Sequence, residues 1–129
     1  MSSHPIELIL LKQWASYIAI PMWITDAAGN LLFYNEPAES ILGHRFEEAG
    51  EINAEELAET YTTRDLDDSP LLAKELPIVV ALVEGVPAYR KLKIRGLDGS
   101  WRTIEVSAIP IIGEGKRLVG ALATFWEQP

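Results

Sequence analysis

The chain has 129 residues, enough for one domain that buries about two thirds of the surface of its unfolded chain. Apolar residues make up 48% of it and charged residues 23%, the profile of a folded globular protein. The net charge of −8 argues against nucleic acid as a direct partner, and no apolar run approaches the ~18 residues that span a membrane. The absence of cysteine excludes disulfides and thiolate chemistry and favours a cytoplasmic location.

The first predicted element is a helix over Pro5–Ala19, which Pro21 ends. Its apolar stripe, at three- and four-residue spacing, consists of Ile6, Ile9, Leu10, Trp14, Tyr17 and Ile18. Leu8 and Leu11 widen this stripe. Two arrangements fit the pattern: the helix packs only on its own sheet, or it is buried on two sides, against the sheet and a second subunit.

The segment from 21 to 43 predicts a hairpin followed by a short helix. Two apolar runs, 21–26 and 30–35, are joined by a glycine-containing turn. Asn35 is suited to cap a helix over 36–42, and Gly43 is suited to end it.

The middle of the chain, 44–69, is acidic and irregular. A capping-box pattern at Asn53–Glu56 predicts a short helix that ends near Tyr61. The acidic run 64–68 predicts a solvated loop and no metal site, since its spacing does not match a calcium-binding loop. A turn at 71–75 and a largely buried helix over Pro77–Glu84 follow.

Three strands complete the chain. The third strand is predicted over Val86–Leu97, and Asp98-Gly99 predicts a two-residue hairpin turn into the fourth, which ends at Pro110. The run from Leu118 to Trp126 is apolar on both faces, so this last strand is expected to be central in its sheet. The element order predicts an α+β domain with an antiparallel sheet.

The chain resembles the PAS family over Pro21 to Glu127. The residues that carry the resemblance, by their order and spacing, are Thr25, Asp26, Gly29, Asn35, Gly43, Leu76, Pro77, Gly85, Asp98, Gly99, Ser100, Val106, Pro110, Val119, Gly120 and Ala121. The resemblance implies a five-stranded antiparallel sheet with short helices on its concave face. It divides the chain into an N-terminal flanking helix, 1–20, and a PAS domain, 21–129.

PAS domains are typically sensory and dimerisation modules of histidine kinases, cyclic-dinucleotide enzymes and transcription regulators. The resemblance therefore implies a signalling role without enzymatic activity, and a homodimer formed through the flanking helix. No effector segment follows the last strand, and the usual exit motif is replaced by Trp126-Glu-Gln128. The sequence leaves open whether the chain is a free-standing protein or a fragment.

Alternation along the strands predicts which side chains face the family's ligand pocket. On the third and fourth strands it points five residues inward, namely Leu92, Ile94, Ile104, Val106 and Ala108. Matching to the family adds Trp23, Thr25, Gly120, Leu122 and Thr124, and the helix over 77–84 adds Val79, Leu82 and Val83. The same match points Ala121, Ala123 and Phe125 outward, toward the flanking helix or a partner subunit.

This lining is mainly aliphatic and contains no inward Arg or Lys, so it disfavours a strongly anionic ligand. A small apolar ligand or a filled core both fit it. The resemblance excludes a thiol-adduct flavin, because there is no cysteine, and disfavours haem, because no histidine lies on 77–84. Non-covalent flavin stays open. His4 and His44 are expected at the surface.

An enzyme is the remote alternative. A small α+β cone of the ketosteroid-isomerase type would need a carboxylate base in an apolar cavity. The strand carboxylates available are Glu105 and Glu127, and alternation points Glu105 outward. No catalytic residue is predicted.

Overall fold

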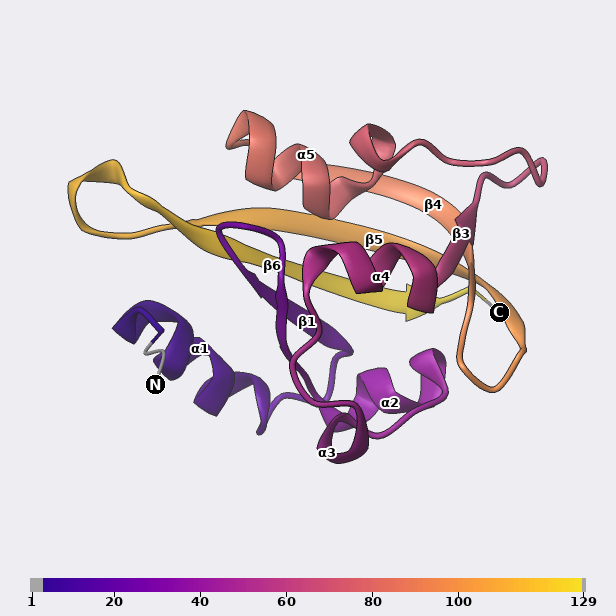
Figure 1. The fold of residues 1–129 in the computed structure, drawn as a ribbon, viewed down its shortest axis with the longest axis horizontal. Coiled ribbons are helices and arrows are strands. Elements are labelled where there is room, and N and C mark those ends of the chain that lie inside the picture. The colour runs from indigo at the N-terminus through magenta and orange to yellow at the C-terminus, as the bar shows by residue number, and fades with distance from the viewer. Residues whose placement is uncertain (1–3, 129) are drawn as a thin grey trace.

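A single antiparallel sheet organises residues 4–128, which the computed structural model describes (Figure 1). Its strand order is β2-β1-β6-β5-β4-β3. The strands are β1 (Met22–Asp26), β2 (Leu31–Tyr34), β3 (Thr62–Arg64), β4 (Ala88–Arg95), β5 (Trp101–Ile112) and β6 (Leu118–Glu127). The α+β class and the inner position of β6, between β1 and β5, are therefore confirmed.

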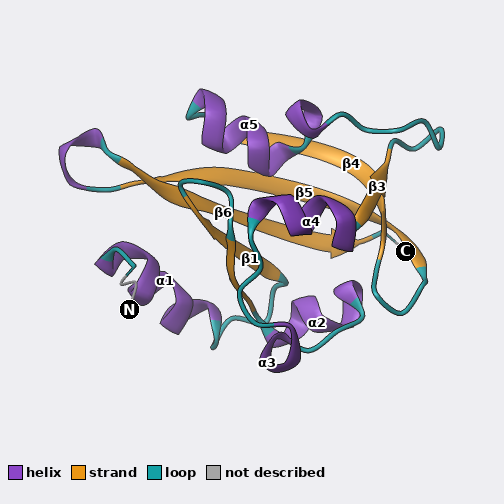
Figure 2. Ribbon diagram, in the orientation of Figure 1, coloured by secondary structure: helices purple, strands orange, loops and turns teal. Residues whose placement is uncertain are grey.

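The strand count is six rather than five. The additional strand is β3, a three-residue edge strand that pairs with β4 (Figure 2). It is too short to produce a two-residue period in the sequence. The fourth strand also runs past Pro110 to Ile112, and a turn containing the 3₁₀ segment Glu114–Lys116 leads into β6.

Five α-helices surround the sheet. They are α1 (Ile6–Ala15), α2 (Glu36–Leu42), α3 (Phe46–Ala49), α4 (Ala54–Thr60) and α5 (Pro77–Glu84). A 3₁₀ turn, Ala73–Glu75, precedes α5. The predicted boundaries of α2, α4 and α5 agree with the structure, including the Asn35 and Asn53 caps and the left-handed Gly43 and Gly85 ends. The short helix α3 was not predicted.

The first helix ends at Ala15, four residues before the predicted end. Its last turn is closed by Ser16, whose hydroxyl donates to the Lys12 carbonyl oxygen at 2.9 Å. Beyond it, the side-chain amide of Asn35 donates to the carbonyl oxygens of Ala15, Ile18 and Ile20. These carbonyls are satisfied without further helical turns.

The predicted two-residue turn at Asp98-Gly99 is wrong, because β4 ends at Arg95 and a five-residue loop, 96–100, joins it to β5. Leu97 N–H donates to the Leu42 carbonyl oxygen at 2.8 Å, so this loop docks on the end of α2. A Cβ at Gly96 would lie 2.8 Å from the same oxygen. The longer loop thus supplies a hydrogen-bond donor to the last carbonyl group of α2.

Two apolar cores lie on opposite faces of the sheet. The helix-side core lies beneath α2, α4 and α5 and includes Tyr34, Ile41, Tyr61, Ala81, Leu92, Ile104 and Phe125. The outer core lies beneath α1 and consists of Leu8, Ala15, Met22, Ile24, Leu32 and Val119, with Leu11 packed against it. Within residues 4–128, no helix is long and apolar enough to cross a membrane. Residues 1–3 of the predicted flanking unit, and Pro129, lie outside the described residues.

Candidate functional site

The helix-side core is where the predicted ligand pocket would lie. Seven of the predicted pocket residues face it, as expected: Trp23, Thr25, Leu92, Ile94, Ile104, Val106 and Ala108. Strand register explains this arrangement, because residues directly opposite one another across two strands share a face. Trp23 is opposite Tyr34 and Ala123, and Leu92 is opposite Ile104. Their role toward a ligand stays a prediction.

The predicted orientation of β6 is wrong by one residue. Ala121 and Ala123 are opposite Thr25 and Trp23 of β1, and Phe125 is opposite Val106 of β5. All three side chains of β6 are buried in the helix-side core. Leu122 instead packs toward α1, and Gly120 and Thr124 share its face. Because the strand is apolar on both faces, its pattern held no contrast to fix the orientation.

Helix α5 contributes less to the pocket than predicted. Ala81 is buried and Leu82 packs against the helix-side core, as expected of the inward face of the helix. Val83 is 78% exposed, whereas Val79 is partly buried. Of the residues of α5 only Val83 and Glu84 are exposed, so the helix is largely buried or partly buried, as predicted, and Val83 is wrong as a pocket residue.

Aromatic rings fill the centre of the helix-side core. Trp23 stacks on Tyr34 with ring centroids 6.0 Å apart, and it meets Tyr61 edge-on at 5.5 Å. Phe46 meets Tyr34 edge-on at 5.2 Å. A flavin ring would have to displace this cluster. Sequence reasoning missed Tyr34, Tyr61 and Phe46, although Tyr34 lies on a predicted strand.

Two tyrosine hydroxyl groups lie within this apolar core. The Tyr34 hydroxyl donates to the His44 carbonyl oxygen at 3.0 Å. The Tyr61 hydroxyl is buried and interacts with Tyr34 closely enough to affect the pKa of both groups, but it forms no well-directed hydrogen bond among the described residues. Burial raises the pKa of both tyrosines, so both stay neutral at physiological pH. A buried hydroxyl without a partner is costly in free energy, and it is therefore a polar group that a ligand or a water molecule would stabilise.

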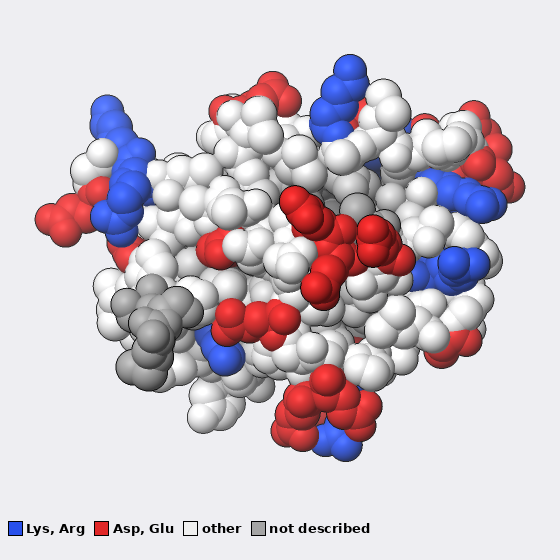
Figure 3. Space-filling model, viewed as in Figure 1, with Lys and Arg blue, Asp and Glu red and all other residues white. Residues whose placement is uncertain are grey.

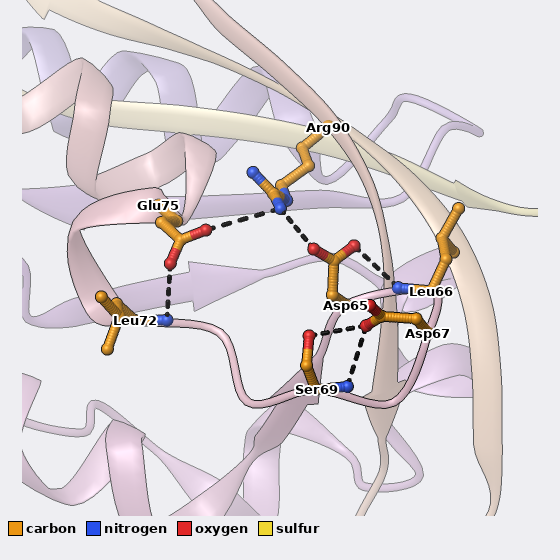
Figure 4. Close-up of polar contacts among 7 residues, drawn as sticks. All are labelled: Asp65, Leu66, Asp67, Ser69, Leu72, Glu75 and Arg90. Atoms are coloured by element: carbon orange, nitrogen blue, oxygen red, sulfur yellow. Dashed lines mark hydrogen bonds and ion pairs between the residues drawn. The ribbon is translucent and has the colours of Figure 1, made fainter.

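An inward cation also lies on β4, contrary to the prediction. Arg90 shares the face of Leu92, and its Nη2 lies 2.7 Å from Asp65 and 3.5 Å from Glu75 (Figure 4). The two carboxylates come from opposite ends of the segment between β3 and α5. Its Nε is buried without a partner in the described residues. Arg90 thus fixes this segment at the edge of the helix-side core.

Two hollows on the surface of the described residues are open, and neither lies between the sheet and the helices. One is lined by Glu39, Ser40, Gly43, His44, Arg45 and Glu48. The other is lined by Arg64, Asp68, Lys93, Trp101, Arg102 and Thr103. On the face seen in Figure 3, acidic side chains gather near the centre and most basic ones lie toward the margins. Helices α3 and α4 carry two acidic residues each in their first turns.

The outer face carries α1, held at both ends. Glu7 pairs with Arg117 of the β5–β6 turn at 3.6 Å, and Asn35 binds the carbonyls that follow the helix. Leu8 and Ala15 face the sheet. The predicted stripe is exposed at every position. Ile6, Ile9, Leu10 and Trp14 lie on the other side of α1, and Tyr17 and Ile18 follow its end.

Comparison with solved structures identifies the fold. A PAS domain from Colwellia psychrerythraea superimposes with a TM-score of 0.65 at 19% identity, covering 95% of this chain and 97% of that one. The LOV protein of Rhodobacter sphaeroides gives a TM-score of 0.73 at 11% identity, covering 97% and 69%. The PAS domain of nitrogen regulation protein NR(II) from Vibrio parahaemolyticus gives 0.63 at 15%, covering 92% and 98%. No family model and no curated protein sequence matches the chain. The chain has the PAS fold.

Proposed function

We propose that this chain is a PAS sensory and dimerisation module in signal transduction, with residues 1–20 as its flanking segment, which contains α1, and 21–129 as the PAS domain. It would pass the state of a ligand or partner, by protein–protein contacts, to a histidine kinase, a transcription regulator or another output domain. The proposal is supported by the PAS fold and by its similarity to a LOV protein and a nitrogen regulation protein. The cytoplasmic location predicted from the sequence stays a prediction.

The observation that carries the proposal is the exposed stripe of α1. Ile6 is 61% exposed, Leu10 46% and Trp14 68%, on a helix whose other side is docked, and Tyr17, just past its end, is 91% exposed. A contiguous apolar surface of this kind marks a protein–protein interface. A second copy that pairs through this stripe would form a two-fold, self-complementary contact. The β6 residues Ala121, Ala123 and Phe125 are not part of the proposed interface, since they are buried within their own subunit.

Light scattering after size-exclusion chromatography tests the dimer. We expect a dimer at tens of micromolar for the natural chain and a monomer for Trp14→Glu, because burial of a carboxylate in the interface is costly. The matched control is Val83→Glu, which places the same group at an exposed valine on α5. A monomeric natural chain, or an equal response of the two variants, contradicts the proposal.

A second candidate function is that of a ligand sensor, favoured by the Tyr61 hydroxyl, which is buried in the helix-side core and forms no well-directed hydrogen bond among the described residues. The ligand would be small and mainly apolar, with one polar group that reaches this hydroxyl. Native mass spectrometry of freshly purified protein should then show an added mass. Tyr61→Phe should weaken retention of that mass, whereas an unliganded mass from every preparation contradicts this candidate.

The surroundings of Glu105 argue against the isomerase alternative. Glu105 is on the outer face, where it accepts hydrogen bonds from the Tyr89 hydroxyl and the Trp126 indole. The Tyr89 hydrogen bond holds the pKa of Glu105 below its usual range, which is the opposite of what a buried general base requires. We therefore propose a role without catalysis.

A further inference from the structure

A group of cations surrounds Trp101 on the outer face, where β3, β4 and β5 meet. We call Arg64, Lys93, Arg95 and Trp101 the basic corner. Strand register puts Arg64 directly opposite Lys93, and Arg95 directly opposite Trp101. Like charges directly opposite each other destabilise a sheet, so the Arg64–Lys93 pairing is unfavourable unless an anion neutralises it.

The two guanidinium groups of the basic corner flank the indole ring. The Arg64 Cζ lies 4.8 Å from the Trp101 ring centroid and the Arg95 Cζ lies 5.7 Å from it. A guanidinium held against an aromatic ring keeps N–H groups at its edge free to donate. Among residues 4–128 neither arginine forms an ion pair, although the sequence has 19 acidic residues to 11 Lys and Arg.

The chain itself places one carboxylate at this corner. Asp68 lines the hollow that also contains Arg64, Lys93, Trp101 and Thr103, and its Oδ1 lies 2.9 Å from Lys93 Nζ. Asp68 has a φ of 69°, a left-handed conformation that aspartate adopts more readily than most residues with a side chain. Its side chain remains 64% exposed. The hollow thus admits a carboxylate carried on a peptide loop, and the one present is open to solvent on its other side.

We propose that the basic corner binds a carboxylate side chain of an acidic segment of a partner protein, and that this segment displaces Asp68. Arg64 and Arg95 each offer a planar fork to a carboxylate, Lys93 adds a point charge, and Trp101 gives an apolar wall for the aliphatic stem. At physiological salt, charges more than about 8 Å away are screened. A short acidic segment bound here is therefore attracted by the cations of the basic corner more than it is repelled by the net charge of −8 on the whole chain. A long nucleic-acid strand would extend over the acidic surface and be repelled by it. The inference does not depend on pairing through α1.

The test uses the full chain and a fluorescently labelled hexaglutamate peptide, with binding followed by fluorescence anisotropy. We expect binding that weakens between about 30 mM and about 300 mM salt, over which the Debye length falls about threefold. The double variant Arg64→Gln/Arg95→Gln should lose at least about tenfold in affinity, because its charge-assisted hydrogen bonds are gone. Asp68→Asn, which removes the internal competitor, should gain about threefold or more. Lys116→Gln, which removes one positive charge in the β5–β6 turn, should bind like the natural chain.

Each contrary result overturns a definite part of the proposal. A double variant within about twofold of the natural chain, or an equal loss in Lys116→Gln, removes the basic corner as the site. An unchanged affinity in Asp68→Asn removes the displacement step. If pyrophosphate or single-stranded RNA binds more tightly than hexaglutamate, the proposed acidic protein segment is wrong and the basic corner is a site for that ligand instead. Circular dichroism checks folding, and these variants should fold, because Arg64, Asp68 and Arg95 are exposed.

Discussion

Asn35 joins three elements through one buried side chain. Its Oδ1 accepts hydrogen bonds from Met22 N–H at 2.9 Å and from Ala38 N–H at 3.4 Å. Its Nδ2 donates to Ala15, Ile18 and Ile20, the carbonyls between α1 and β1. The residue therefore caps α2, starts β1 and fixes the end of the flanking helix at the same time.

Replacing Asn35 by Ala should lower the free energy of unfolding by about 2–4 kcal/mol, because a helix cap is lost and buried carbonyls lose their donor. Urea denaturation measures the change. Asn53→Ala is the control, since Asn53 caps α4 in the same way, accepting from Glu56 N–H at 2.9 Å, but is exposed. It should cost about 1 kcal/mol. Equal losses in the two variants would contradict a joining role for Asn35.

Gly120 allows β1 and β6 to approach each other. A Cβ at this position would lie 2.1 Å from the Thr25 carbonyl oxygen, which belongs to the backbone and cannot rotate away. Gly120→Ala should therefore separate the strands and destabilise the domain by about 2 kcal/mol or more. At Gly85, where a Cβ would meet nothing within 4 Å, alanine should cost only the left-handed backbone strain of about 1–2 kcal/mol. Thermal unfolding of both variants distinguishes the two effects.

At the scale of elements, the sequence predicts those with a polar–apolar contrast or a specific cap. The caps Asn35 and Asn53 and the glycine ends of α2 and α5 are local chemistry, so their positions were predictable. The orientation of β5 followed from its alternation. The orientation of β6 did not, because both of its faces are covered, and only the register with β1 and β5 determines which side chains face the helices.

The same limit applies to the candidate site. The residues Arg90, Tyr34 and Tyr61 matter through their tertiary partners, which lie on segments distant in the chain. Arg90 is two residues before Leu92 and four before Ile94, so alternation along the strand predicts that it faces inward with them. The prediction was not made because the other basic residues of the strand face outward. The apolar stripe of α1 was predicted from its spacing. The sequence did not show that Leu8 and Ala15 face the sheet while the stripe itself faces away from it.

The outer face of β4, β5 and β6 should weaken in acid. Glu105 there accepts hydrogen bonds from Tyr89 and Trp126, and the first of these lowers its pKa. A carboxyl whose folded pKa is lowered contributes stability above its unfolded value of about 4.3, and this is lost as the pH falls through the folded value. Asp98, at the β4–β5 loop, behaves alike through its hydrogen bond from Ser100 N–H. Urea midpoints below about pH 5 should fall less steeply for Glu105→Gln than for the natural chain. Parallel curves would contradict this assignment.

At the scale of the whole molecule, the sheet separates two kinds of surface. Its helix side buries an aromatic core, and acidic helices lie over it. Its outer side is covered by α1 at the β1 end, while the basic corner lies at the β3 end. The apolar stripe and the basic corner therefore lie at different ends of the sheet, and one molecule could engage a second copy and an acidic segment together.

Pairing through α1 has a consequence for stability that needs no variant of the core. A partner that binds only the folded state stabilises it in proportion to the logarithm of its concentration. The melting temperature of the natural chain should therefore rise by about 2–4 °C for each tenfold increase in protein concentration above the dimer dissociation constant. That of Trp14→Glu should stay constant, whereas Val83→Glu should follow the natural chain. A melting temperature independent of concentration in the natural chain would contradict pairing through α1.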